Sequence, residues 1–172
     1  RENSLLIFDE IVSGFRVSLG GAQELYNVTP DLTCCGKGMG NGYPISAVVG
    51  RREVMELFDE VFFSFTFGGE SLSLAATKAT LTEMKDKNVI GHLWEQGRRL
   101  RDGYNIQAKE YGIDGNTKCI GHGPRPTPSF ETDSGITWLE LKSLFQQEWL
   151  KRGVLFLGGH TPVSYTHLTL PT

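Results

Sequence analysis

Cysteine is scarce in this chain, and its few thiols lack the spacing of a cross-linked or metal-binding protein. The three cysteines are Cys34, Cys35 and Cys119, an odd number with no CxxC pair. A disulfide scaffold and a zinc site are therefore not expected. We predict reduced thiols, no metal, and a cytoplasmic location.

Long apolar runs and an excess of positive charge are also missing. No apolar stretch approaches the roughly 18 to 20 residues that span a bilayer. The formal net charge is −3, which offers no broad attraction to nucleic acid or to an anionic membrane. With 172 residues, 39% of them hydrophobic, the chain is long enough for one or two globular domains with a core.

Both ends of the chain look artificial. It opens at Arg1 without a methionine, so the lack of a targeting signal is uninformative. The last ten residues, "VSYTHLTLPT" (163–172), resemble the in-frame translation of a sequencing adapter, although a genuine polar tail is the alternative. We expect a fragment with an adapter-derived end and assign no role to His167.

The hydrophobic pattern predicts an α/β fold with a mostly parallel sheet. Short apolar runs alternate with loops in the first third, and long helical patterns follow from Glu70. A [ST]xxE capping box at Thr137 opens a last helix, which Gly153 ends. Expected strands are 4–8, 29–35, 45–50 and 154–157, and expected helices are 23–26, 51–58, 70–85, 89–111 and 137–151.

One lysine stands out because four glycines surround it. In "LTCCGKGMGNGYPISAVVG" the long side chain of Lys37 emerges where the backbone is bare. The letters match neither a Walker A motif nor GxGxxG, so a nucleotide-binding loop is rejected. A solvated loop charge and an amine held against a ligand both remain open.

A lysine that forms an imine needs an open approach path and an electron sink nearby. The glycines supply the path. Asp9, at the end of the first buried strand, would hold a pyridine nitrogen protonated. Ligands of parallel sheets sit beyond the carboxyl ends of the strands, where both residues are expected, in low-dielectric surroundings that strengthen the ion pair.

Three stretches together carry a resemblance to a known family. They are "LLIFDEIVSGFR", "GGAQELYNVTPDLTCCGKGMGNGYPISAVVGRRE" and "TFGGESLSLAA". They resemble the class III, pyridoxal-phosphate-dependent aminotransferases, in the branch that includes glutamate-1-semialdehyde 2,1-aminomutase. The resemblance is strong over 4–76 and weakens up to Gly159. It implies the fold-type I architecture, with residues 1–97 in the large cofactor-binding domain, 98–162 in a small α+β C-terminal domain, and pyridoxal 5′-phosphate (PLP) as cofactor.

The resemblance also implies roles by position. Lys37 would be the Schiff-base lysine and proton shuttle, Asp9 the partner of the pyridinium nitrogen, and Ile11 the apolar side chain on the ring face. Thr66 would bind the cofactor phosphate of a neighbouring subunit, which implies a homodimer, and amides at the following helix start would assist. Arg125 would meet a substrate carboxylate, with a surface loop arginine as the alternative.

Two departures from the family leave the activity open. Familiar members read "TFSGNPL" where this chain reads "TFGGESL", so Glu70 and Ser71 replace an Asn-Pro pair. The family's upstream phosphate loop is absent from the chain. We predict amino transfer between a small-molecule amine or amino acid and a carbonyl acceptor. An intramolecular aminomutase, or a truncated relative that binds a ligand without turnover, are the alternatives.

Overall fold

The computed structural model describes residues 4–132 and 135–155. The chain divides into two compact units, Arg1–Ile90 and Gly91–Thr172. The boundary expected at Gly97 falls a few residues after this division, inside a helix.

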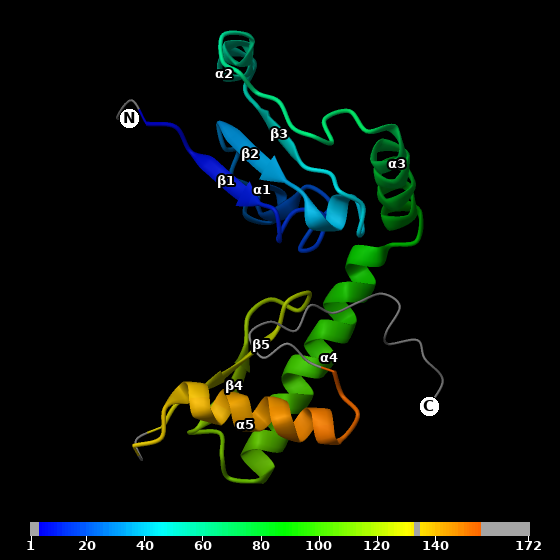
Figure 1. The fold of residues 1–172 in the computed structure, drawn as a ribbon. Helices are drawn as coiled ribbons and strands as arrows, with labels where there is room; N and C mark the ends of the chain where they lie inside the picture. The colour runs from blue at the N-terminus through cyan, green and yellow to red at the C-terminus, as the bar shows by residue number, and fades with distance from the viewer. Residues whose placement is uncertain (1–3, 133–134, 156–172) are drawn as a thin grey trace. The chain divides into compact units, whose positions relative to one another are not determined.

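The first unit is built on a three-stranded sheet in the order β1-β2-β3 (Figure 1). Strands β1 (Ile7–Glu10) and β2 (Leu32–Cys35) are parallel, and β3 (Ala47–Gly50) runs antiparallel to β2. The short helix α1 (Gly21–Tyr26) packs on one face, where Gln23 Nε2 donates to the hydroxyl of Thr33 at 3.4 Å. Side chains alternate along β1, so Phe8 and Glu10 face α1 while Ile7 and Asp9 face away.

Two expectations for this sheet are wrong in detail. The pair β2–β3 is antiparallel because only residues 36–46 join the strands, fewer than the roughly dozen residues that a parallel crossover needs. The first strand was expected to be buried, yet Leu5, Leu6 and Ile7 are exposed. Ile7 begins the edge strand β1 and lies on the face that α1 does not cover, and Leu5 and Leu6 precede the strand.

Short helical turns lead from the sheet to a long helix. Helix α2 (Arg52–Met55) and the 3₁₀ turn η2 (Glu56–Asp59) follow β3, as the pattern predicted. Helix α3 (Ser71–Asp86) then begins directly after Glu70, whose side chain accepts hydrogen bonds from the first turn. The expected helix start just past Gly69 is therefore confirmed.

The second unit combines α4 (Val89–Glu110), a hairpin of β4 (Thr117–Ile120) and β5 (Thr127–Phe130), and α5 (Trp138–Lys151). The capping box is confirmed, since Thr137 Oγ1 accepts from the N–H of Glu140 at 3.3 Å and the Glu140 carboxylate accepts from the N–H of Thr137 at 2.7 Å. Gly153, with φ 78°, ends α5 as expected.

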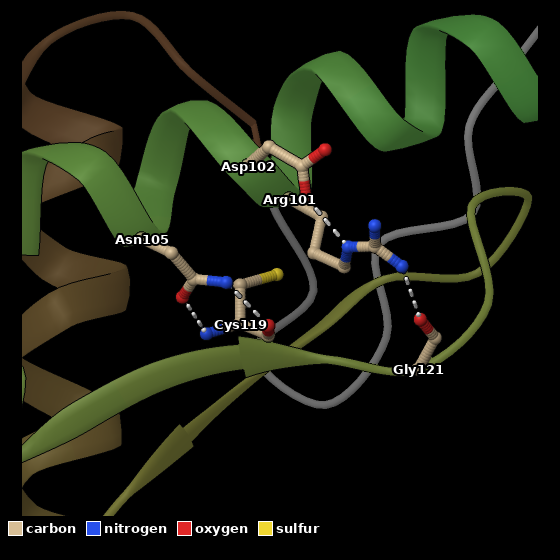
Figure 2. Close-up of polar contacts among 5 residues, drawn as sticks. All are labelled: Arg101, Asp102, Asn105, Cys119 and Gly121. Carbon is tan, nitrogen blue, oxygen red and sulfur yellow. Dashed lines mark hydrogen bonds and ion pairs between the residues drawn. The ribbon is translucent and has the colours of Figure 1, made fainter.

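The hairpin was not predicted, because Pro126 and Pro128 argue against a strand. Figure 2 shows the contacts between Asn105 and Cys119, the residue that pairs with Pro128. The outward N–H and C=O of Cys119, the residue opposite Pro128, are both bonded to the Asn105 side chain of α4, at 2.8 and 2.9 Å. The polar backbone groups of Cys119 therefore do not need a hydrogen bond from Pro128, which has no N–H to donate.

Some expectations fall on parts of the chain that the structure does not describe. Of the expected last strand, Val154 and Leu155 are described and form no strand. Its remaining residues, 156–157, and the tail 163–172 lie outside the described residues. No helix within the described ranges has the length and apolar character to cross a membrane.

Candidate functional site

The last two residues of β1 have different surroundings because they point to opposite faces of the sheet. Glu10 lies on the α1 face, where its carboxyl group accepts a hydrogen bond from the N–H of Gln23 at 3.0 Å. Only 1% of Glu10 is exposed. Asp9 lies on the other face, opposite Cys34 of β2, and is exposed. Asp9 is therefore open to a ligand, and Glu10 is not.

The Asp9 carboxylate is held at one oxygen only. Its Oδ1 accepts the N–H of Ile11 at 3.1 Å. Within the described ranges 4–132 and 135–155, no hydrogen bond or ion pair engages Oδ2. Ile11, two residues further along the chain, is half-buried. Asp9 thus keeps one oxygen available for a cationic N–H donor.

Lys37 follows β2 and begins the 3₁₀ turn η1 (Lys37–Met39) with a left-handed backbone, φ 41°. Such a conformation costs a non-glycine residue on the order of 1–3 kcal/mol. The flanking glycines leave its surroundings bare. A methyl group built on Gly36 would lie 3.8 Å from Ile11 Cγ2, and one built on Gly38 would lie 3.7 Å from the carbonyl oxygen of Gly14.

The Lys37 side chain is exposed, and the described part of the chain offers its ammonium no hydrogen bond or ion pair. A strained backbone that carries an unpaired amine is typical of a residue held for function. Because β1 and β2 are parallel, Asp9 and Lys37 both lie at the carboxyl ends of these strands, as predicted. We expected both residues to lie in low-dielectric surroundings. This expectation is wrong in the described part of the chain, because both side chains are exposed.

Thr66 lines a groove of about 630 Å³ in the first unit. The groove lies between residues 44–46, which follow the Lys37 loop, and residues 64–70, which lead into α3. The side chain of Thr66 is exposed. Its hydroxyl is therefore accessible to a ligand, as the phosphate role requires.

The start of α3 differs from the phosphate site that we expected. The Glu70 carboxylate accepts hydrogen bonds from the N–H groups of Leu72 and Ser73 at 2.8 and 2.7 Å, and from the Ser73 hydroxyl at 2.6 Å. The Ser73 hydroxyl, followed by these two amides, lowers the pKa of Glu70, which is anionic at neutral pH. The expectation that these amides assist in binding a phosphate is wrong, because the chain's own carboxylate occupies them.

Arg125 belongs to the second unit. It lies in the loop between β4 and β5, half-buried, and its backbone N–H donates to the carbonyl of His122 at 2.9 Å. A role toward a substrate carboxylate stays a prediction.

The burial of Glu10 and the capping role of Glu70 were not predicted from the sequence. The burial of Glu10 depends on Gly21, which has φ 76° and no side chain to fill the space that the carboxyl group occupies. A methyl group on Gly21 would lie 2.6 Å from Glu10 Oε1. A signal for Glu70 was its place just before a helical pattern, where an acidic side chain is favoured.

The described residues fit most of the expected PLP group. Asp9 Oδ2 suits a protonated ring nitrogen, Ile11 offers an apolar contact, and the unpaired Lys37 amine suits an aldehyde carbon. For the phosphate, this chain offers the exposed hydroxyl of Thr66 but not the amides that Glu70 occupies.

Comparison with known proteins places the chain among transaminases. The family described as aminotransferase class-III matches residues 1–163. A glutamate-1-semialdehyde 2,1-aminomutase from Francisella tularensis is 40% identical over 124 residues, which are 70% of this chain and 29% of that protein. A second, glutamate-1-semialdehyde 2,1-aminomutase 2 from Brevibacillus brevis, is 37% identical over 164 residues, 90% of this chain and 38% of that protein. The chain thus spans about a third of these relatives.

Solved structures agree with this assignment. An omega-transaminase from Sphaerobacter thermophilus superimposes with a TM-score of 0.81 at 26% identity, covering 93% of this chain and 39% of that one. The FumI protein of Sphingopyxis sp. MTA144, solved with PLP, gives a TM-score of 0.81 at 28% identity over 91% of this chain and 37% of that one. The α/β fold is therefore that of the fold-type I, PLP-dependent transaminases.

Proposed function

Because the chain belongs to the aminotransferase class-III family, we propose that the enzyme containing it moves an amino group from an amine or amino acid to a carbonyl acceptor. One observation carries the proposal. A lysine amine with no partner among the described residues stands between glycines that lie near Ile11 and Gly14. It is at the same end of β1 and β2 as a carboxylate with one oxygen engaged. PLP is the family's cofactor and, when bound, supplies an aldehyde and an electron-accepting ring.

The residues of the first unit divide the work. Asp9 would hold a proton on the ring nitrogen through Oδ2, while Oδ1 stays anchored on the Ile11 N–H. The Ile11 side chain would limit how the ring tilts. Lys37 Nζ would bind the cofactor until the substrate replaces it. The freed amine would then take a proton from the substrate carbon and later return it. Its exposed position supports both tasks, because no residue in the described part of the chain must first give up the amine.

Two further assignments follow from the family resemblance. We infer that Thr66 donates its hydroxyl to a phosphate held by a second subunit, so that the enzyme acts as a homodimer. We infer that Arg125 receives a substrate carboxylate, since a guanidinium matches its two oxygens. The three unpaired thiols support a cytoplasmic location.

A second candidate is an aminomutase, which shifts the amino group within one molecule. The names of the curated relatives favour it, at 40% and 37% identity. Glu70 argues against assigning the aminomutase activity to this chain from the names alone. It places an anionic carboxylate in the Thr66 groove, where familiar members have asparagine.

Isotope transfer separates the candidates. The full-length enzyme is incubated with PLP, a ¹⁵N-labelled amine and an unlabelled keto acid, and the products are analysed by mass spectrometry. Amino transfer predicts ¹⁵N in the new amino acid. An aminomutase converts an amino aldehyde alone into its isomeric amino ketone, with no acceptor and no exchange of label. If neither product forms although PLP binds, a ligand-binding relative without turnover becomes the better description.

A further inference from the structure

Glu10 is the most deeply buried acidic side chain among the described residues, and its contacts tie three segments together. Its Oε2 accepts a hydrogen bond from the Ser13 hydroxyl, and its Oε1 accepts one from the Gln23 N–H at 3.0 Å. Its backbone carbonyl accepts the Gly14 N–H at 2.8 Å. One residue at the end of β1 thus anchors both the turn 11–14 and the first turn of α1.

The residues around Glu10 are closely packed against it. A methyl group on Gly21 would lie 2.6–2.7 Å from the three carboxyl atoms of Glu10, and one on Gly14 would lie 2.7 Å from the Glu10 carbonyl oxygen. Real Cβ atoms essentially never lie this close to another heavy atom. Burial, followed by the nearby Glu10 carboxylate, also raises the pKa of the Cys35 thiol, in keeping with a shared face of the sheet.

The turn that Glu10 anchors is also the support of the Lys37 loop. Within this turn, Ile11 packs next to Gly36, and the carbonyl of Gly14 lies next to Gly38. These two glycines flank Lys37 on both sides. The turn and the Lys37 loop are therefore close neighbours on both sides of Lys37, so a displacement of the turn would change the space around both glycines.

We propose that Glu10 is a positioning residue, whose buried carboxyl group holds the turn 11–14 against the Lys37 loop and thereby fixes the reactive amine. It does not touch the cofactor, because it lies on the face of β1 opposite Asp9. The inference rests on the proposed function of Lys37. It adds that this function also requires the buried carboxyl group of Glu10 on the α1 face of the sheet. Since a misplacement of about 1 Å can cost about 10²-fold in rate, the effect on Lys37 is measurable.

The test compares variants of the full-length enzyme. Glu10→Ala removes both side-chain hydrogen bonds. Glu10→Gln keeps an oxygen for the Gln23 N–H and an amide that can donate to the Ser13 hydroxyl. Glu24→Ala is the matched control, because Glu24 makes similar contacts, to the Ser18 hydroxyl and the Gly20 N–H, in an exposed position away from the Lys37 loop.

Two measurements are made on each protein. PLP is added, the mixture is quenched with borohydride at intervals, and the rate at which the Lys37 peptide gains mass is divided by the amount of PLP bound. Hydrogen exchange of residues 11–14 and 36–40 is followed without PLP. We expect Glu10→Ala to slow labelling by about tenfold to 10²-fold and to speed exchange in both segments. Glu10→Gln should restore most of both, and Glu24→Ala should match the wild type.

Each outcome decides the question. If the wild type labels Lys37 and Glu10→Ala labels it at the same rate per bound PLP, the positioning role is wrong and the proposed function stands. If Glu10→Ala does not fold, Ser13→Ala decides, because it removes one of the two side-chain hydrogen bonds of Glu10: slower labelling with an unchanged melting temperature supports the role, and wild-type labelling together with wild-type exchange overturns it. If the wild type never labels Lys37, the proposed function fails and takes this inference with it.

Discussion

Gly97 of α4 packs so closely on Gly123 that a methyl group on Gly97 would lie 1.6 Å from the Gly123 carbonyl oxygen. Gly103 lies further along the same helix, and a methyl group there would meet nothing within 4 Å. We expect Gly97→Ala to destabilise the protein by at least about 1–3 kcal/mol, because the helix and the loop must separate. Gly103→Ala should stabilise it by about 0.5–1 kcal/mol. Urea unfolding of both variants checks this; equal effects would contradict the close approach.

Asn105 replaces a missing strand neighbour for β4, since its side chain bonds to both the N–H and the C=O of Cys119. Asn105→Ala should cost about 1–3 kcal/mol, because a buried backbone group loses its partner. Gln107→Ala is the control on the same helix, since the Gln107 side-chain amide donates to the exposed Glu110. Chemical denaturation of the two variants measures the difference. A change in Asn105→Ala no larger than in Gln107→Ala would show that water replaces the amide.

Cys119 should be an inert thiol in the folded protein. Burial raises its pKa to about 11, and it is 3% exposed. At pH 8 about one molecule in a thousand would carry the thiolate, which is the reactive form. A thiol reagent should therefore modify Cys119 only after unfolding, as followed by peptide mass. Modification in the folded state at the rate of a free cysteine would contradict the burial.

The same shift gives a pH dependence of stability with a definite sign. The folded state holds the Cys119 proton more tightly than the unfolded state, whose thiol has the ordinary pKa of 9.0. The stabilisation is therefore fully present below pH 9 and is lost as the pH rises toward about 11. Cys119→Ala should show a smaller loss of melting temperature than the wild type across this interval. Parallel curves for the two proteins would argue against the shift.

Glu70 should weaken binding of the cofactor phosphate at the Thr66 groove. Glu70→Asn keeps a good N-cap residue for α3 but removes the negative charge. We expect tighter PLP binding in the full-length variant, with a larger gain at low salt because the repulsion is then less screened. Glu83→Asn, an exposed charge near the other end of α3, is the control. A dissociation constant unchanged by Glu70→Asn would place the phosphate elsewhere.

The sequence predicted those parts of the molecule whose signal is local. The capping box at Thr137, the stop at Gly153 and the helix start after Gly69 depend on a few neighbouring residues, and all are confirmed. The antiparallel β3 and the hairpin β4–β5 depend on which distant segment pairs with which, and the pattern did not reveal them.

The candidate site divides in the same way. Asp9 and Lys37 could be placed from their positions after apolar runs, because strand ends are visible in the letters. The burial of Glu10 could not, since it follows from the fold of the residues between Glu10 and Gln23, which brings the Gln23 N–H to its carboxyl group. Which of two adjacent acids faces a ligand is decided by the side of the sheet that α1 covers.

The central claim is that Lys37 is the amine that binds PLP, and one measurement tests it most directly. The full-length protein is mixed with PLP, reduced with borohydride, digested and analysed by mass spectrometry, with Lys78 of α3 as an internal exposed lysine. The account predicts the added mass on the Lys37 peptide and none above background on the Lys78 peptide. Mass on another lysine, with Lys37 unmodified, would contradict it.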